Sequence, residues 1–310
     1  MLKIINLIRD EKGTVMVLVA CAMIALLGFT SLVTDTGLLI LNKVKLTNAI
    51  DSAVLAGVQE LPDDPTGALN VANSYAAMNG AAEGEATFQI ADNNTSIIGA
   101  SQRQVKLVFA KIMGINTSDV KAQAKARIAP VTGMTGAAPL GVIEDDFQFG
   151  QEIVLKEGSG DNQQKGWFSA LSLGLTGADI FRTNLKNGYN GEIKVNDIIN
   201  TETGNMSEPT RAGIAYHIDE CHHVPECTFN SFDRNCSRIL LVPIVTVNEI
   251  TSGGHIDSIK VVGFGAFFVD SYIGNGQDNE IKGSFIHYVI PDKSSTQGRN
   301  FGLYGSQLCE

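Results

Sequence analysis

The feature that most constrains this chain is an uncharged apolar run near its N-terminus. No Asp, Glu, Lys or Arg occurs between Lys12 and Asp35, and residues 14–33 are mostly Val, Leu, Ala, Met, Ile and Phe. At a rise of ~1.5 Å per residue, about twenty such residues cross the roughly 30 Å hydrocarbon core of a bilayer. The sequence therefore predicts a transmembrane helix over residues 14–34, with the lipid bilayer as its first partner.

Basic side chains precede this run and predict its orientation. Lys3, Arg9 and Lys12 lie just before it, and the positive-inside rule then places residues 1–13 in the cytoplasm. We expect a single-pass protein of the cell membrane whose C-terminal part is extracytoplasmic. The main alternative is a cleavable signal peptide, but the run is long for one and no small-x-small cleavage site follows it before Asp35.

The apolar pattern continues beyond the predicted membrane span, over residues 35–61. Leu46, Ile50, Val54 and Val58 recur every four residues with polar residues between them, and no proline occurs before Pro62. This spacing predicts one helix from about Thr14 to Glu60. Its second half is amphipathic, and its apolar stripe is a candidate surface for packing against partner helices.

Several residues occur in an order that is specific enough to compare with known families. A glycine precedes the apolar run, an acidic residue and a glycine follow it, and the helix ends in small residues. The residues concerned are Gly13, Asp35, Gly37, Asp51, Ala53, Leu55, Ala56 and Gly57. Together they resemble the N-terminal segment of TadE/TadG-like proteins of the Tad (tight adherence) family, which take part in Flp pilus assembly. In that family's processing site a glutamate follows the glycine by five residues, and Leu18 stands there in this chain.

This resemblance implies a structural or assembly role rather than a catalysed reaction. It implies a membrane-anchored, surface-exposed structural or assembly component of a Flp/Tad-type pilus, acting in surface attachment and cell adhesion. The implied partners are other Flp/Tad pilus or secretion-machine proteins, contacted through the N-terminal helix.

The rest of the chain predicts an α+β fold in two parts. Residues 62–130 contain a helical pattern followed by alternating strand patterns, which predicts a small, pilin-like helix-plus-sheet domain. Residues 131–140 include several small and helix-breaking residues and carry no charge, and they are the predicted linker. In residues 141–310, short β-branched strings alternate with glycine-rich or polar turns, so we expect a mainly β extracytoplasmic domain.

One cysteine- and histidine-rich stretch is the candidate for chemistry. In an oxidising compartment an even set of four cysteines predicts two disulfides, with Cys221 bonded to Cys227 or Cys236 and with Cys309 holding the C-terminus. This interpretation expects no bound metal. The alternative is a zinc site, because thiolate and imidazole groups are zinc ligands. Its candidate ligands are His217, Cys221, His222, His223, Cys227 and Cys236.

Charge and the absence of motifs exclude several functions. The chain has 33 acidic and 23 basic residues and a formal net charge of −10, which argues against a nucleic-acid partner. It contains no Walker loop, no Gly-x-Ser-x-Gly elbow and no dinucleotide fingerprint, so we expect no enzyme and no cofactor. The alternative function is a membrane-tethered zinc-dependent hydrolase, or a wall- or ligand-binding module, that uses the His217 to Cys236 stretch.

Overall fold

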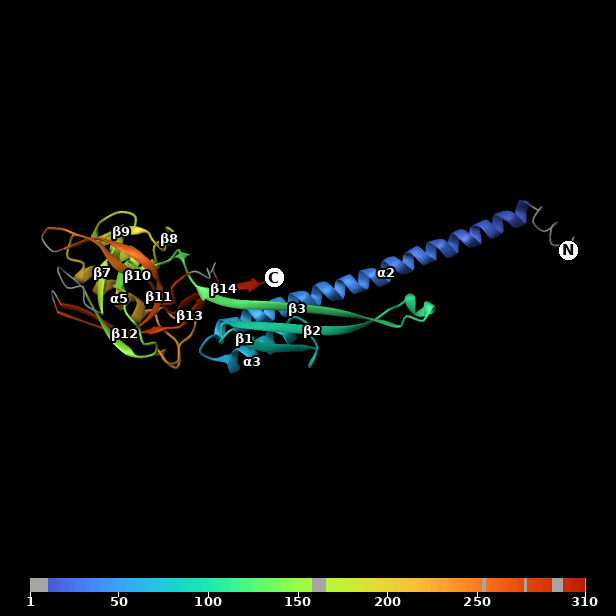
Figure 1. Ribbon diagram of the computed structural model, residues 1–310, viewed down its shortest axis with the longest axis horizontal. Helices are drawn as coiled ribbons and strands as arrows, with labels where there is room; N and C mark the ends of the chain where they lie inside the picture. The colour runs from blue at the N-terminus through green and yellow to red at the C-terminus, as the bar shows by residue number, and fades with distance from the viewer. Residues whose placement is uncertain (1–10, 158–165, 253–254, 276–277, 292–297, 310) are drawn as a thin grey trace.

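The computed structural model describes residues 11–157, 166–252, 255–275, 278–291 and 298–309. It is an elongated molecule in which a long N-terminal helix leads to a β-rich part at the opposite end (Figure 1). The α+β class, with a long apolar helix at the N-terminus and a mainly β C-terminal region, is confirmed.

The long helix α2 extends over Glu11–Gly57, and a short 3₁₀ helix, η1 (Val58–Glu60), continues it. The sequence predicts this length because no proline interrupts the helix before Pro62. From residue 46 onward one side of α2 is buried: Leu46, Ile50, Val54 and Val58 are fully inaccessible to solvent. The amphipathic half of the helix is therefore a core element of the fold.

A five-stranded sheet and a second helix cover that buried side. The helix is α3 (Pro65–Met78), which starts with a proline and is capped by Asp64, whose side chain accepts a hydrogen bond from the backbone of Gly67. The sheet has the order β1-β2-β3-β14-β13 and is antiparallel except for the pair β13–β14. Its strands are β1 (Ala86–Ala91), β2 (Ser96–Lys106), β3 (Thr117–Pro130), β13 (Tyr288–Ile290) and β14 (Leu303–Cys309).

Small residues let α2 and α3 approach each other closely. Ala53 on α2 and Ala68 and Ala72 on α3 are fully buried. A Cβ atom added to Gly57 would lie 2.7 Å from the backbone oxygen of Ala68 and 3.0 Å from the Cβ atom of Ala72. The small residues near the end of α2 thus act in helix packing.

The other part of the molecule is built on a seven-stranded sheet of order β10-β5-β7-β6-β12-β11-β9. Helices α4 (Ala178–Asn187) and α5 (Ser207–Asp219) pack against each other beside it, and β4 (Gly133–Met134) pairs with β8 (Ile193–Lys194). The strands of the large sheet are β5 (Leu140–Ile143), β6 (Glu152–Glu157), β7 (Trp167–Ala170), β9 (Ile198–Asn200), β10 (Ile239–Ile250), β11 (Ile256–Asn275) and β12 (Asp278–Ile286).

The predicted domain bounds stay a prediction, but two features bear on them. Residues 131–140, the predicted linker, contain β4 and several buried side chains, among them Val131, Met134 and Ala138. Strand β14, near the C-terminus of the chain, pairs with β3 in the first sheet. The chain therefore passes into the β-rich part and returns from it.

Polar contacts at the end of α2 join the two parts, and we call this region the joint. Arg234 donates a hydrogen bond to the carbonyl oxygen of Gln59 and forms an ion pair with Glu60 at 3.1 Å. His287 contacts Asp63 at 2.6 Å. Because Arg234 lies in the connection between α5 and β10, that connection positions the β-rich part on the helix.

Candidate functional site

The first candidate site is the exposed N-terminal half of α2. In the described part of the chain, one helix is long and apolar enough to cross a membrane, and its most apolar stretch buries nothing inside the protein. Large apolar side chains project from it on all sides, including Leu18, Ile24, Phe29 and Val33, each more than 60% exposed. Such a surface is stable in lipid and costly in water.

Asp35 is the first buried residue of the helix among those whose burial the structure describes. Its carboxylate, 7% exposed, accepts hydrogen bonds from the backbone N–H groups of Val108 at 2.8 Å, Phe109 at 3.1 Å and Ala110 at 2.7 Å. Burial alone raises the pKa of this carboxyl, but the three N–H groups outweigh it and the pKa is lowered. A charged Asp35 therefore fastens the connection between β2 and β3 to the helix.

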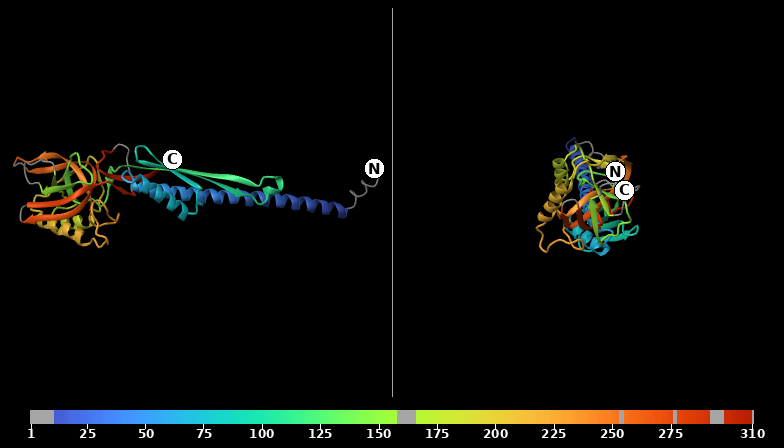
Figure 2. Two further views of the ribbon diagram at one scale, coloured as in Figure 1. Left: turned by 90° about the horizontal axis from the view of Figure 1, so that it is seen from below. Right: turned by 90° about the vertical axis from the view of Figure 1, so that its left-hand side faces the viewer.

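That connection exposes apolar residues next to the end of the predicted membrane span, and we call residues 107–116 the hairpin tip. It includes the short helix η2 (Ala110–Met113). Val108, Ile112 and Ile115 are 58%, 87% and 52% exposed. Figures 1 and 2 show the hairpin of β2 and β3 extending along α2 toward the N-terminus, so that its tip lies beside the helix, away from the β-rich part.

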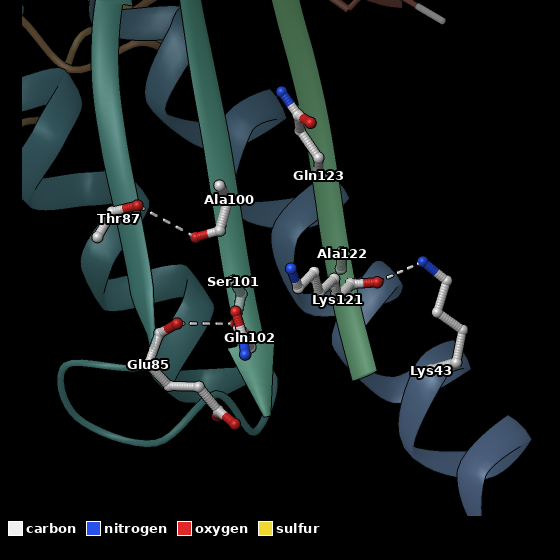
Figure 3. Close-up of a pocket in the computed structure, with 9 residues that line it drawn as sticks. All are labelled: Lys43, Glu85, Thr87, Ala100, Ser101, Gln102, Lys121, Ala122 and Gln123. Carbon is white, nitrogen blue, oxygen red and sulfur yellow. Dashed lines mark hydrogen bonds between the residues drawn. The ribbon is translucent and has the colours of Figure 1, made fainter. Parts of the chain in front are cut away.

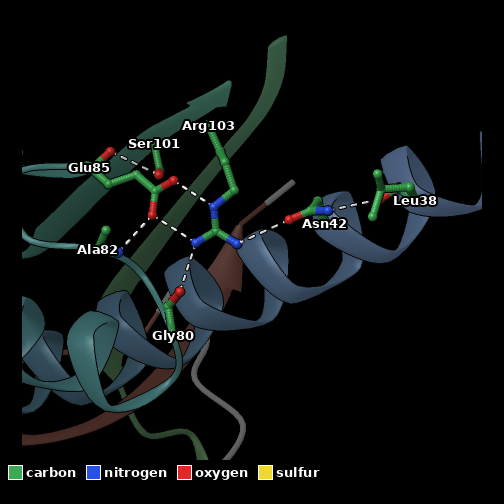
Figure 4. Close-up of polar contacts among 7 residues, drawn as sticks. All are labelled: Leu38, Asn42, Gly80, Ala82, Glu85, Ser101 and Arg103. Carbon is green, nitrogen blue, oxygen red and sulfur yellow. Dashed lines mark hydrogen bonds and ion pairs between the residues drawn. The ribbon is translucent and has the colours of Figure 1, made fainter. Parts of the chain in front are cut away.

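A second set of polar contacts holds the hairpin on the helix (Figure 4). The guanidinium of Arg103 on β2 donates to both carboxylate oxygens of Glu85, at 2.6 and 2.7 Å, and to the carbonyl oxygen of Gly80 at 2.7 Å. A longer contact of 3.4 Å reaches Asn42 on α2. The hydrogen bonds from Arg103 lower the pKa of Glu85, and those to Glu85 raise the pKa of Arg103.

An open groove of about 600 Å³ lies beside this network (Figure 3). Its lining is polar or small, and two of its charged residues are held by contacts within the protein: Lys43 donates to the carbonyl oxygen of Lys121, and Glu85 binds Arg103. These contacts join elements of the fold to one another, so we interpret the groove as part of the fold rather than as a ligand site.

The predicted apolar stripe of α2 is covered by the protein itself, which corrects its sequence-based interpretation as a surface for partner helices. Leu46, Ile50, Val54 and Val58 are buried against the protein's own sheet and α3. A different face remains exposed, where Ile40, Leu41 and Val44 are 59%, 51% and 51% exposed. Ile40 and Val44 follow Val33 and Gly37 at helical spacing, so this face continues the apolar surface of the membrane span.

The second candidate site is the cysteine- and histidine-rich connection between α5 and β10. The structure gathers Cys221, His223, Cys227 and Cys236, whose ligand atoms all lie within 4.8 Å of one another. We call these four residues the Cys₃His cluster. The two cysteines at 227 and 236 are buried, and the other two residues are half-buried.

The structure leaves the other candidate residues of that stretch outside the cluster. His217 on α5 hydrogen-bonds through both ring nitrogens to carbonyl oxygens, that of Leu185 at 2.7 Å and that of Ser237 at 2.8 Å. His222 is exposed, and Cys309 lies on β14 opposite Lys125. The described cysteines are all free thiols, and the disulfide pairing stays a prediction.

The thiols of the cluster influence each other's ionisation. Burial opposes ionisation of Cys221, yet hydrogen bonds from His223 and Cys236 lower its pKa to about 6. Burial raises the pKa of Cys236 to about 12, and the nearby Cys221 adds to this effect. The pair therefore loses its first proton readily and its second reluctantly.

Comparison with known proteins bears on the first site. Residues 13–60 match the family model of Flp pilus-assembly TadE/G-like proteins, named Tad. Over these residues the N-terminal helix is similar to the TadE/G-like family. The match covers the exposed apolar half, Asp35, and the small-residue ending at Gly57, which confirms the resemblance expected from the sequence. No curated protein and no solved structure matches the chain.

This match over residues 13–60 supports a pilus-assembly-related role, and with the apolar helix it supports anchoring in a membrane. Sequence reasoning missed the partners of Asp35 and the pair of Arg103 with Glu85. The contacts to Asp35 come from residues 73 to 75 positions away, and they are made by backbone groups, which leave no signal in a sequence.

Proposed function

We propose that this protein is a single-pass, surface-exposed structural or assembly component of a Flp/Tad-type pilus machine, with residues 1–13 in the cytoplasm and the folded part outside. The observation that carries the proposal is the change in α2 at Asp35. Before it the helix is apolar and exposed, and after it the helix contacts the folded part of the protein and, from Leu46 onward, contributes one side to its core. The TadE/G-like match covers both halves.

The hairpin tip supports this placement of the membrane. If residues 14–34 span the bilayer, Asp35 lies at its outer surface and brings the tip to the same level. Ile112 and Ile115 then contact the interfacial region, and Lys106 and Lys111, which precede Ile112 in sequence, are suited to anionic headgroups. Each exposed apolar side chain that enters this region contributes to anchoring.

The helix also sets the distance between the membrane and the rest of the protein. From Asp35 to Gly57 it rises roughly 33 Å at ~1.5 Å per residue. The Asp35 contacts and the Arg103 network hold β2 and β3 against this length of helix. The β-rich part is thus carried at a fixed height above the bilayer, where it is available for attachment or assembly.

The proposed contact with pilus proteins is the exposed face of α2 around Ile40 and Val44, which continues the membrane span. A second apolar helix that leaves the bilayer at the same point can pack on this face without a change in the protein's own core. The partner we expect is therefore another pilus-assembly protein with an N-terminal membrane helix.

The test is photo-crosslinking from residue 40 or 44 in a host with a functional Flp pilus, with the exposed Leu175 of the β-rich part as the control position. We expect crosslinks to a pilin or assembly protein from the two helix positions only, and loss of piliation when the gene is deleted. Normal piliation in the deletion strain would refute the proposed role.

A further inference from the structure

The Cys₃His cluster has the ligand types of a closed zinc site. The sulfur of Cys221 lies 3.4 Å from the sulfur of Cys236 and 3.7 Å from Nδ1 of His223. In a tetrahedral site with Zn–S bonds of about 2.3 Å and a Zn–N bond of about 2.05 Å, two sulfurs lie about 3.8 Å apart, and a sulfur and a nitrogen about 3.6 Å apart. Both distances therefore suit the edges of one tetrahedron.

The groups around the cluster are those that orient metal ligands. Nε2 of His223, the ring nitrogen that faces away from Cys221, lies 3.7 Å from a carboxylate oxygen of Asp233. The backbone N–H of Asp233 donates to the sulfur of Cys227 at 3.4 Å, and the backbone N–H of Arg238 hydrogen-bonds the sulfur of Cys236. A carboxylate behind the histidine and N–H groups on the sulfurs are common around bound zinc, because they fix the ring and stabilise thiolates.

A disulfide would join only two of the four side chains in the cluster. The cluster contains three cysteines, so one disulfide leaves a third thiol, in part buried, without a bonding partner. The fourth cysteine of the predicted pairs, Cys309, lies in the other sheet. A zinc ion uses all three sulfurs and the imidazole at once.

We propose that Cys221, His223, Cys227 and Cys236 bind one Zn²⁺ ion. Zinc binds the three sulfurs as thiolates, whose protons go to solvent, and forms three Zn–S bonds and one Zn–N bond, with no change in oxidation state. Because protein side chains fill all four positions, none is left for a water molecule or a substrate, and the site is structural rather than hydrolytic. The proposal is independent of the pilus role.

The position of this site gives it a specific consequence. Arg234, which contacts Gln59 and Glu60 at the joint, lies between the ligands Cys227 and Cys236. The hydroxyl of Tyr288 donates to the carbonyl oxygen of Arg234 at 2.6 Å. A zinc ion that fixes both flanking cysteines thus holds the connection that seats the β-rich part on the end of α2.

The test is the zinc content of the full-length protein, purified in detergent without chelator and measured by mass spectrometry of the metal. We expect about one zinc per chain in the wild type, and almost none in Cys227→Ser and His223→Ala. The matched controls are Cys309→Ser and His222→Ala, which alter the same residue types outside the cluster and keep their zinc.

X-ray absorption on the wild type gives a second measurement that needs no variant. The expected first shell is three sulfurs at about 2.3 Å and one nitrogen at about 2.0–2.1 Å. A metal-free wild type, zinc retained in Cys227→Ser, or a mapped disulfide between Cys221 and Cys236 would each overturn the proposal. None of these results would affect the proposed pilus role.

Discussion

The contact between α2 and α3 gives the sharpest stability prediction, through Gly57→Ala. Gly57 has ordinary helical backbone angles, φ −63° and ψ −39°, so helix propensity alone favours alanine by about 1 kcal/mol. The added Cβ atom, however, would lie 2.7 Å from the backbone oxygen of Ala68, and a backbone atom of a packed helix cannot rotate away. Overpacking of this kind costs about 1–3 kcal/mol, and we place this contact in the upper half of that range.

The net expectation for Gly57→Ala is a loss of about 1–2 kcal/mol, or about 2–8 °C in Tm for a domain of this size. The assay is thermal unfolding of the full chain in detergent, followed by circular dichroism. Gly37→Ala is the matched control in the same helix, because nothing lies within 4 Å of its added Cβ atom, and its Tm should stay unchanged or rise. A Tm that rises equally in both variants would refute the close-packing argument.

Three further predictions concern the contacts around the helix and the hairpin tip. Arg103→Gln should destabilise the protein by about 2 kcal/mol, which is below the value for a fully buried pair because both side chains are slightly exposed. Since Arg103 lowers the pKa of Glu85, the ion pair stabilises the fold at pH values above the pKa of Glu85 in the unfolded chain. Denaturant titrations should therefore show the stability difference between wild type and variant shrinking below about pH 4, as Glu85 is protonated. Asp35→Asn removes the charge that faces three N–H groups, so hydrogen exchange at residues 108–110 should become severalfold faster, and unchanged exchange would show that the charge is dispensable. In vesicles with brominated lipids and a Trp167→Phe background, Ile112→Trp fluorescence should be quenched and Leu175→Trp fluorescence should not; equal emission from both would contradict contact of the tip with the membrane.

The sequence predicted the elements whose signals are local. The uncharged run, the four-residue spacing after it and the absence of proline before Pro62 predict one continuous helix, and α2 with η1 extends from Glu11 to Glu60. The α+β class follows from equally local signals, the helical pattern after Pro65 and the alternating β-branched strings. These patterns report how single elements bury their apolar faces.

The contacts that assemble those elements were beyond such reasoning, because they join distant residues. The spacing of Leu46 and Ile50 indicates an apolar stripe but not what covers it, and the structure shows the protein's own sheet there. In the same way, the cysteines and histidines between His217 and Cys236 indicate a candidate stretch for disulfides or a zinc site. Only the path of the chain shows that His223 joins the three cysteines while His217 binds backbone carbonyls.

The most direct test of the central claim, an N-terminal helix that anchors an extracytoplasmic domain, is residue-specific labelling in spheroplasts with a membrane-impermeant maleimide. Two variants suffice, Lys3→Cys before the span and Leu175→Cys on the exposed surface of the β-rich part, with labelled peptides identified by mass spectrometry. The account predicts that residue 175 reacts in intact spheroplasts and that residue 3 reacts only after permeabilisation. Labelling of residue 3 in intact spheroplasts, with residue 175 protected, would contradict it.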